Sequence, residues 1–187
     1  MQPAPPDDAR TPRVNTAQYV GDVTDLDDWQ ARVDAFWAAF DDSDPERMLA
    51  QMRTLVDERP SGDAVALAEW GGVHDSLGLE ADAVGPYRAA LAAGLDPDRA
   101  HQVTLQLAST LRNLGEHDEA IELLSGLDAP ELGDAPSAFL ALALHSAGRK
   151  DEALSVALTA LAPHLPRYGR AAAAYAGGLS SALAPEE

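Results

Sequence analysis

The 187-residue sequence contains no cysteine and a single lysine. The lack of cysteine excludes disulfides and thiol chemistry, although it does not identify a compartment. Aromatic residues make up only 5% of the chain, and no continuous apolar stretch is long enough for a secretory signal or a membrane span. A cytoplasmic location is therefore the default expectation.

Basic residues are also scarce. The chain has 13 of them against 31 acidic residues, which gives a formal net charge of -18. This charge would repel nucleic acid phosphates and anionic lipid headgroups, so neither a nucleic acid nor a membrane is an expected partner. Four basic residues could meet as one positive patch at an end of the fold, or could be separate solvated helix ends: Arg149, Lys150, Arg167 and Arg170.

The residue patterns of known catalytic sites are missing. There is no phosphate-binding glycine loop, no nucleophile elbow, and no pair of histidines at helical ligand spacing with a carboxylate. His74 and Asp75 are adjacent, but neighbours in a helix point about 100° apart and do not face each other. We therefore predict no enzyme activity, no cofactor and no metal site. The histidines are scattered over different predicted helices, at His74, His101, His117, His145 and His164.

The sequence does contain an internal repeat. Three similar stretches carry the glycines Gly78, Gly115 and Gly148, which are 37 and 33 residues apart. This spacing fits one pair of antiparallel helices per unit. Glycine can adopt the left-handed conformation that ends one helix and turns into the next. Five residues after each glycine comes a small residue that lets two helices approach closely, at Ala83, Ala120 and Ala153.

Capping signals mark several helix starts. Asp44-Pro45 and Asp96-Pro97 each place a capping carboxylate before a proline suited to the first helical turn. Pro86 falls inside one expected helix, where it either bends that helix or marks a later start. Periodicity and caps together predict helices at residues 28–41, 45–58, 63–77, 80–93, 97–114, 117–126, 135–147, 150–163 and 167–183.

The first 27 residues differ in composition from the rest. They contain four prolines and an acidic run, with few sizeable apolar side chains. Such a composition is typical of a flexible arm. We therefore expect residues 1–27 to form an arm, residues 28–184 to form one domain and residues 185–187 to form a tail.

These units resemble the tetratricopeptide repeat, and the whole arrangement is similar to the group-five tetratricopeptide proteins of high-GC bacteria. The likeness covers about residues 29–165. The best-matching unit has Trp70, Gly71, Tyr87 and Ala90 at the larger aromatic and small-residue positions. The next two units keep the small residue of the first helix but replace the tyrosine, and a degenerate unit precedes all three. The residues concerned are Ala108, Leu124, Ala141 and Ala157 in the later units and Phe36, Ser43, Met48 and Pro60 in the degenerate unit.

The resemblance implies an all-α fold, a right-handed α-solenoid of antiparallel helix pairs. It has about three clear repeats, one degenerate N-terminal repeat and a C-terminal capping helix. In the family, the first helix of each unit lines a concave groove in which peptides bind. The implied function is a non-catalytic scaffold that binds a peptide or helix of another protein. Self-association through the terminal helices is the alternative, and a small-molecule sensor or an enzyme has less support.

A polar stripe on the first helix of the second clear unit is the candidate groove surface. It consists of residues at helical spacing between apolar positions, namely Gln102, Gln106, Ser109, Arg112 and Asn113. Equivalent sites one unit earlier and later are Asp75 and His145, so that Asp75, Arg112 and His145 could form a row that anchors a peptide. Alternatively, Asp75 and Arg112 pair with each other across the repeat interface, which contributes little if they are exposed.

Chaperone adaptors of this family hold the terminal carboxylate of a peptide with lysine, asparagine and arginine side chains. The corresponding positions in this chain supply no cation for a carboxylate; they are Val65, Ala68, Gly72, Gln102, Gln106 and Phe139. Binding of chaperone tails is therefore not predicted.

Aromatic residues gather near both ends of the predicted domain. The first helix carries a stripe that must be largely buried, formed by Trp29, Val33, Phe36, Trp37 and Phe40. Trp37 and Phe40 either face the groove and grip a ligand or pack in the core. One face of the last helix could cap the final repeat or bury against a second copy in a homodimer, and it consists of Tyr168, Ala171, Ala172, Tyr175 and Leu179.

Overall fold

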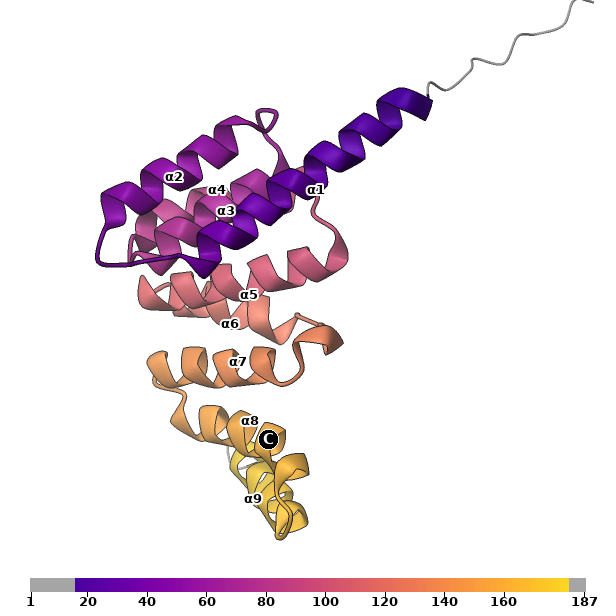
Figure 1. Ribbon diagram of the computed structural model, residues 1–187. Coiled ribbons are helices and arrows are strands. Elements are labelled where there is room, and N and C mark those ends of the chain that lie inside the picture. Colours follow the sequence, from indigo (N-terminus) through magenta and orange to yellow (C-terminus); the bar gives the residue numbers. More distant parts are fainter. Residues whose placement is uncertain (1–15, 182–187) are drawn as a thin grey trace, which may run out of the picture. The chain divides into compact units, whose positions relative to one another are not determined.

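The computed structural model describes residues 16–181, with side chains described for residues 27–179 (Figure 1). Within this part every regular element is helical, and from α2 to α9 each helix packs against the next. The predicted all-α solenoid class is therefore confirmed. The helices are α1 (Thr16–Ala38), α2 (Pro45–Asp57), α3 (Ala64–Ser76), α4 (Glu80–Ala93), α5 (Pro97–Asn113), α6 (His117–Ser125), α7 (Ala135–Ser146), α8 (Lys150–Leu161) and α9 (Gly169–Ser181), with 3-10 turns η1 (Pro130–Leu132) and η2 (Ala162–His164).

The chain divides into an N-terminal unit that ends at Ala39 and a repeat unit that begins at Phe40. The N-terminal unit consists of α1, which begins at Thr16 and not at the expected residue 28. Residues 16–27 are therefore helical where we expected arm, since no proline interrupts the chain from Thr16 to Ala38. Residues 1–15 of the predicted arm and the predicted tail lie outside the described residues.

The repeat unit is organised by three identical turns. Gly78, Gly115 and Gly148 all have left-handed backbones, with φ of 70°, 88° and 80°. At each turn the residue after the glycine donates its N–H to the carbonyl five residues earlier, which is the hydrogen bond of a Schellman helix end. These bonds are all 2.9 Å long, from Leu79 to His74, from Glu116 to Leu111 and from Arg149 to Leu144. The predicted repeat turn is thus confirmed in all three units.

Helix starts also follow the predicted caps. The side chains of Asp44 and Asp96 accept hydrogen bonds from the backbone N–H groups of Arg47 and Arg99, which satisfies donors that have no partner inside the helix. Pro86 lies in the middle of α4, which begins at Glu80. Of the two interpretations of this proline, the late helix start is therefore wrong.

Small residues let the helices of the repeat unit approach closely. Ala83 and Ala120 are completely buried and Ala153 is nearly so, as their place in the repeat predicts. The tightest contact is between α3 and α4, where Gly71 faces the ring of the fully buried Tyr87. A Cβ atom at Gly71 would lie 2.5 Å from Cδ1 of that ring. The tyrosine can fill the space between these two helices only because residue 71 has no side chain.

We expect Gly71→Ala to destabilise the protein. Alanine favours a helix over glycine by about 1 kcal/mol, but forcing a methyl group against a buried ring costs about 1–3 kcal/mol. The free energy of unfolding measured in denaturant should therefore fall. The matched control is Gly178→Ala in α9, where an added Cβ meets nothing within 4 Å and stability should be unchanged or higher. Equal or greater stability of Gly71→Ala would contradict this description of the packing.

Candidate functional site

Asp75 ties three helices together from inside the repeat unit. Its Oδ1 accepts a 2.8 Å hydrogen bond from the Thr110 hydroxyl of α5, and its Oδ2 accepts a longer, 3.4 Å bond from the Tyr87 hydroxyl of α4. Burial raises the pKa of Asp75 above its ordinary value, although both hydrogen bonds act in the opposite direction. Burial, followed by the charge of Asp75, also raises the pKa of Tyr87. Asp75 thus uses its carboxylate within the chain.

The polar stripe of α5 faces solvent. Gln102, Gln106 and Asn113 are exposed, and Ser109 and Arg112 are partly exposed. The opposite side of the same helix is buried in the core through Val103, Leu107, Ala108 and Leu111. The amphipathic pattern read from the sequence therefore gives the correct orientation of this helix.

Arg112 has unused hydrogen-bonding capacity. Its Nη2 donates a 2.8 Å hydrogen bond to Oδ1 of the neighbouring Asn113. Its Nε is buried and has no acceptor among the described residues, and within that part of the chain no ion pair of Arg112 is found. The pairing of Asp75 with Arg112 that we considered is not observed, because Asp75 instead contacts Thr110 and Tyr87.

The other predicted groove residues have different surroundings. His145 is exposed on α7 and occupies the same place in its unit as Arg112 and Asp75, on helices that pack in the order α3, α5, α7. Trp37 belongs to the N-terminal unit, where it is partly buried with its ring edge-on to Phe36 at a centroid distance of 5.1 Å. The assignment of Trp37 and of the partly buried Phe40 to the groove stays a prediction.

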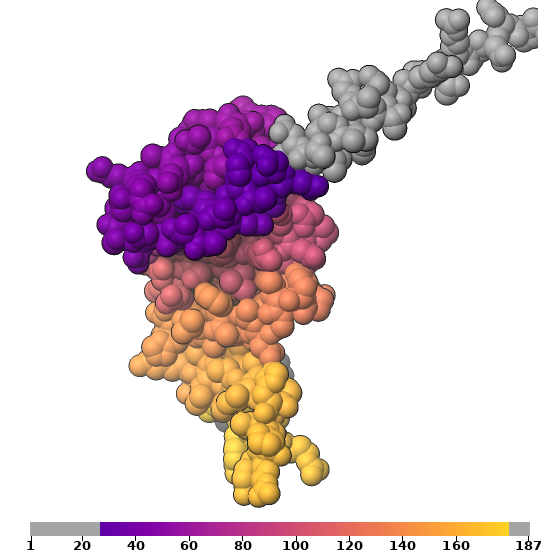
Figure 2. All heavy atoms as spheres, in the orientation of Figure 1, coloured from indigo at the N-terminus to yellow at the C-terminus, as the bar shows by residue number. Residues whose placement is uncertain are grey.

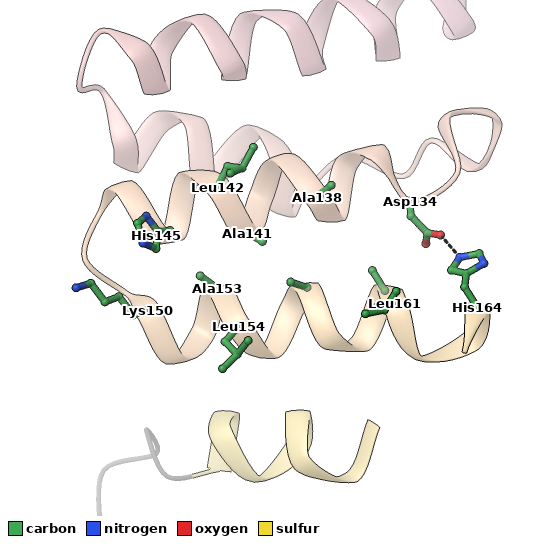
Figure 3. Close-up of a pocket in the computed structure, with 12 residues that line it drawn as sticks. Asp134, Ala138, Ala141, Leu142, His145, Lys150, Ala153, Leu154, Leu161 and His164 are labelled. Atoms are coloured by element: carbon green, nitrogen blue, oxygen red, sulfur yellow. Dashed lines mark hydrogen bonds and ion pairs between the residues drawn. The ribbon is translucent and has the colours of Figure 1, made fainter. Parts of the chain in front are cut away.

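A hydrophobic groove between α7 and α8 was missed by the sequence reasoning. It is open, has a volume of about 640 Å³ and is lined almost wholly by apolar atoms (Figure 3). His145 and Lys150 lie at one end, and His164 and Asp134 lie at the other, joined by a 2.6 Å hydrogen bond. The signal in the sequence was the replacement of the repeat's tyrosine by alanine. The groove residues between these ends are Ala138, Ala141, Leu142, Ala153, Leu154, Ala157, Ala160 and Leu161.

The basic residues near the C-terminus do not meet in one patch. Lys150 begins α8, whereas Arg167 and Arg170 follow its far end. A 12-residue helix separates these ends by about 18 Å. Arg149 pairs with Glu152 through a 2.6 Å contact. The second of our two interpretations, separate solvated helix ends, is therefore the one that the structure supports.

Three histidines take part in local hydrogen bonds. The ring of His74 contacts the Trp70 carbonyl oxygen at 2.7 Å, and His101 contacts the Glu131 carboxylate at 2.6 Å. Among the described residues, no three His, Asp or Glu side chains converge in a way that could hold a metal ion. None of the described helices has the length and apolar character needed to cross a bilayer.

The chain matches a known protein family. The model of the group-five family, described as Tetratrico peptide repeat, matches residues 64–179, which is more than half of the chain. The match begins at the first residue of α3 and extends into α9. It therefore includes all three clear units but not α1 and α2, where we placed the degenerate unit. No curated protein and no solved structure matches the chain significantly.

We expect the stability of Asp75→Asn, measured relative to wild type, to increase as the pH rises. The pKa of Asp75 is raised in the folded protein above the ordinary value of 3.8. Between these two pKa values the folded protein binds more protons than the unfolded chain. The stability that the protonated Asp75 contributes is therefore lost as the pH rises through the folded-state pKa. Asparagine does not titrate. The stability difference, variant minus wild type, should therefore become more positive between about pH 4 and pH 7, as measured by denaturant unfolding.

Asp63→Asn provides a control of opposite sign. Burial raises the pKa of Asp63, but hydrogen bonds from the Ala66 N–H and from Arg59 outweigh it and the pKa is lowered. The stability that Asp63 contributes is present above its unfolded pKa and is lost on acidification. Its variant should therefore lose stability relative to wild type as the pH rises. Parallel pH profiles for the two variants would refute the role of burial at Asp75.

Proposed function

The chain belongs to the tetratricopeptide repeat family, and we propose that it is a non-catalytic scaffold that binds a peptide or helix of a partner protein. Families built from this repeat generally act through interaction surfaces and without catalysis of their own. The proposal places the partner on the exposed side of α5, in the cytoplasm of a bacterium. The stripe formed by Gln102, Gln106, Ser109, Arg112 and Asn113 is the contact surface.

The observation that carries this proposal is the unused donor capacity of Arg112. A buried guanidinium N–H without an acceptor is costly, and most such groups find a partner. A small change of side-chain torsions would turn the Arg112 guanidinium toward a carboxylate or carbonyl oxygen supplied by a bound segment. Hydrogen bonds to such charged groups are the strong ones in proteins.

The glutamines supply the complementary contacts. Gln102 and Gln106 are one helical turn apart and exposed, and each side-chain amide can both donate to and accept from a peptide backbone. The 17 residues of α5 span about 25 Å, enough for several residues of an extended segment. Since the surrounding protein is acidic, with a net charge of -18, we propose a segment with basic side chains and an acceptor opposite Arg112.

Affinity capture from lysate of the native host tests this assignment. The bait is the wild-type chain or the Arg112→Ala, Asn113→Ala double variant, and bound proteins are quantified by mass spectrometry. Loss of charge-assisted hydrogen bonds, each worth about 1.5–3 kcal/mol, should reduce capture of the partner about tenfold or more. Helicity and melting temperature should stay those of the wild type, because the hydrogen bonds of these two side chains, with each other and with Glu80, are exposed to solvent and such contacts contribute little to stability.

The matched control is Arg88→Ala. This variant also removes one exposed arginine, which pairs with Glu119 at 2.7 Å on the second helices of the first two clear units. Its capture profile should equal that of wild type, since an exposed ion pair contributes little to stability. A partner retained equally by wild type, control and double variant would eliminate the α5 stripe as the binding surface.

A further inference from the structure

The α7–α8 groove arises where the third repeat lacks a large side chain between its two helices. In the first clear unit, the Tyr87 ring fills the space over Gly71. The equivalent residues of the third unit, 70 positions later in the sequence, are Ala157 and Ala141, and both line the groove. A methyl group cannot occupy the volume of a tyrosine ring. The groove is therefore shaped for large side chains that its own unit does not provide.

α9, the helix that follows the third clear unit, leaves this groove uncovered. In the earlier units the first helix of the next unit packs on both preceding helices, α5 on α3 and α4, and α7 on α5 and α6. The fourth such helix, α9, packs against α8, and Figure 3 shows α8 lying between α7 and α9. Leu154 and Leu161 consequently remain 49% and 48% exposed. Ile121, the equivalent of Leu154 in the second unit, is only 9% exposed.

The face of α9 that contacts α8 is centred on Ala176. This residue is completely buried, and its carbonyl accepts a 2.8 Å hydrogen bond from the Ser155 hydroxyl. The capping face expected from the sequence is therefore wrong for Tyr168, Ala171 and Tyr175, which are exposed, because the small side chain of Ala176 allows the closer approach to α8. Tyr168 and Tyr175 point away from this contact and are 81% and 74% exposed.

Tyr175 lies in α9, and Tyr168 is the residue immediately before that helix. The carbonyl of Tyr168 accepts a 3.0 Å hydrogen bond from the backbone N–H of Ala172. Tyr168 is also the one described non-glycine residue with a left-handed backbone, at φ 68°. Such a conformation costs about 1–2 kcal/mol and is typical of sites where a side chain is held for binding.

Charge along the repeat unit favours contact at this end. Residues 40–133 carry 19 acidic and six basic side chains, whereas residues 134–181 carry three acidic and four basic ones. Two copies of an acidic protein repel each other over most of their surface. They can approach through their C-terminal helices, which also carry most of the large exposed apolar side chains of the described chain. In Figure 2 this end is the orange and yellow part of the repeat unit.

We propose that the chain forms a two-fold symmetric homodimer in which α9 of each copy lies in the α7–α8 groove of the other. Tyr168 and Tyr175 of the second copy fill the space left above Ala157 and Ala141. Each groove receives the helix that completes its repeat, and the contact is self-complementary as a two-fold axis requires. This inference is independent of the proposed function, because the partner stripe on α5 takes no part in it.

Light scattering after size exclusion tests the oligomeric state. Wild type should have twice the 19.7 kDa chain mass. Tyr175→Ser removes an aromatic anchor and should weaken dimerisation about tenfold or more, and Ala157→Tyr should do the same by filling the groove from within its own chain. The matched control is Leu114→Ser, which removes an apolar side chain that is 43% exposed on the second clear unit. It should remain dimeric, and circular dichroism should show equal helicity in all variants.

Cross-linking between differently tagged chains identifies the contact. The wild type has no cysteine. At a chain concentration high enough to offset the loss of the Tyr175 ring, Ala157→Cys in one chain and Tyr175→Cys in the other should form a disulfide between the two tags on mild oxidation. Leu114→Cys mixed with Ala157→Cys should not. A monomeric wild type would overturn the proposal and leave the groove to a partner protein's helix. A disulfide found only within a chain carrying both cysteines would overturn it in favour of α9 folding into its own groove.

Discussion

Each helix pair of the repeat unit depends on one backbone constraint, a glycine in the left-handed conformation at the end of the first helix. Gly78, Gly115 and Gly148 reverse the chain with the same hydrogen bonds, so each second helix returns along the first. The alanine five residues later is then set against the preceding helix, where only a small side chain fits. Asp75, three residues before its glycine, is brought under the hydroxyl of Tyr87.

One side chain that packs between the paired helices becomes smaller from the first clear unit to the third. The same position holds Tyr87, then Leu124, then Ala157, and the first two are buried whereas the third is exposed. Loss of side-chain volume at one repeat position leaves the apolar groove between α7 and α8. A repeat array must cover its terminal apolar surface to remain soluble. Here α9 covers only one side of α8, which makes the end of the array a surface for association.

Electrostatics separates the two interaction surfaces that we propose. The α5 stripe lies in the strongly acidic part of the repeat unit and offers Arg112 as an isolated cation, which favours a basic partner segment with one acceptor. The α7–α8 groove lies in the nearly neutral part, where two like-charged copies can approach. Because the surfaces are on different helices, a dimer could hold two partner segments at once and gain avidity from both.

The sequence by itself determined the helices from α2 to α9, the turns and the buried side of α5, because capping residues, left-handed glycines and apolar periodicity act over a few neighbouring residues. Family resemblance added the order of packing. Tertiary structure alone decided that Asp75 contacts Thr110 and not Arg112, that residue 176 and not Tyr175 faces α8, and that a groove remains beside Ala157. These outcomes depend on which helices lie side by side and how closely they approach, and residues far apart in the chain determine both.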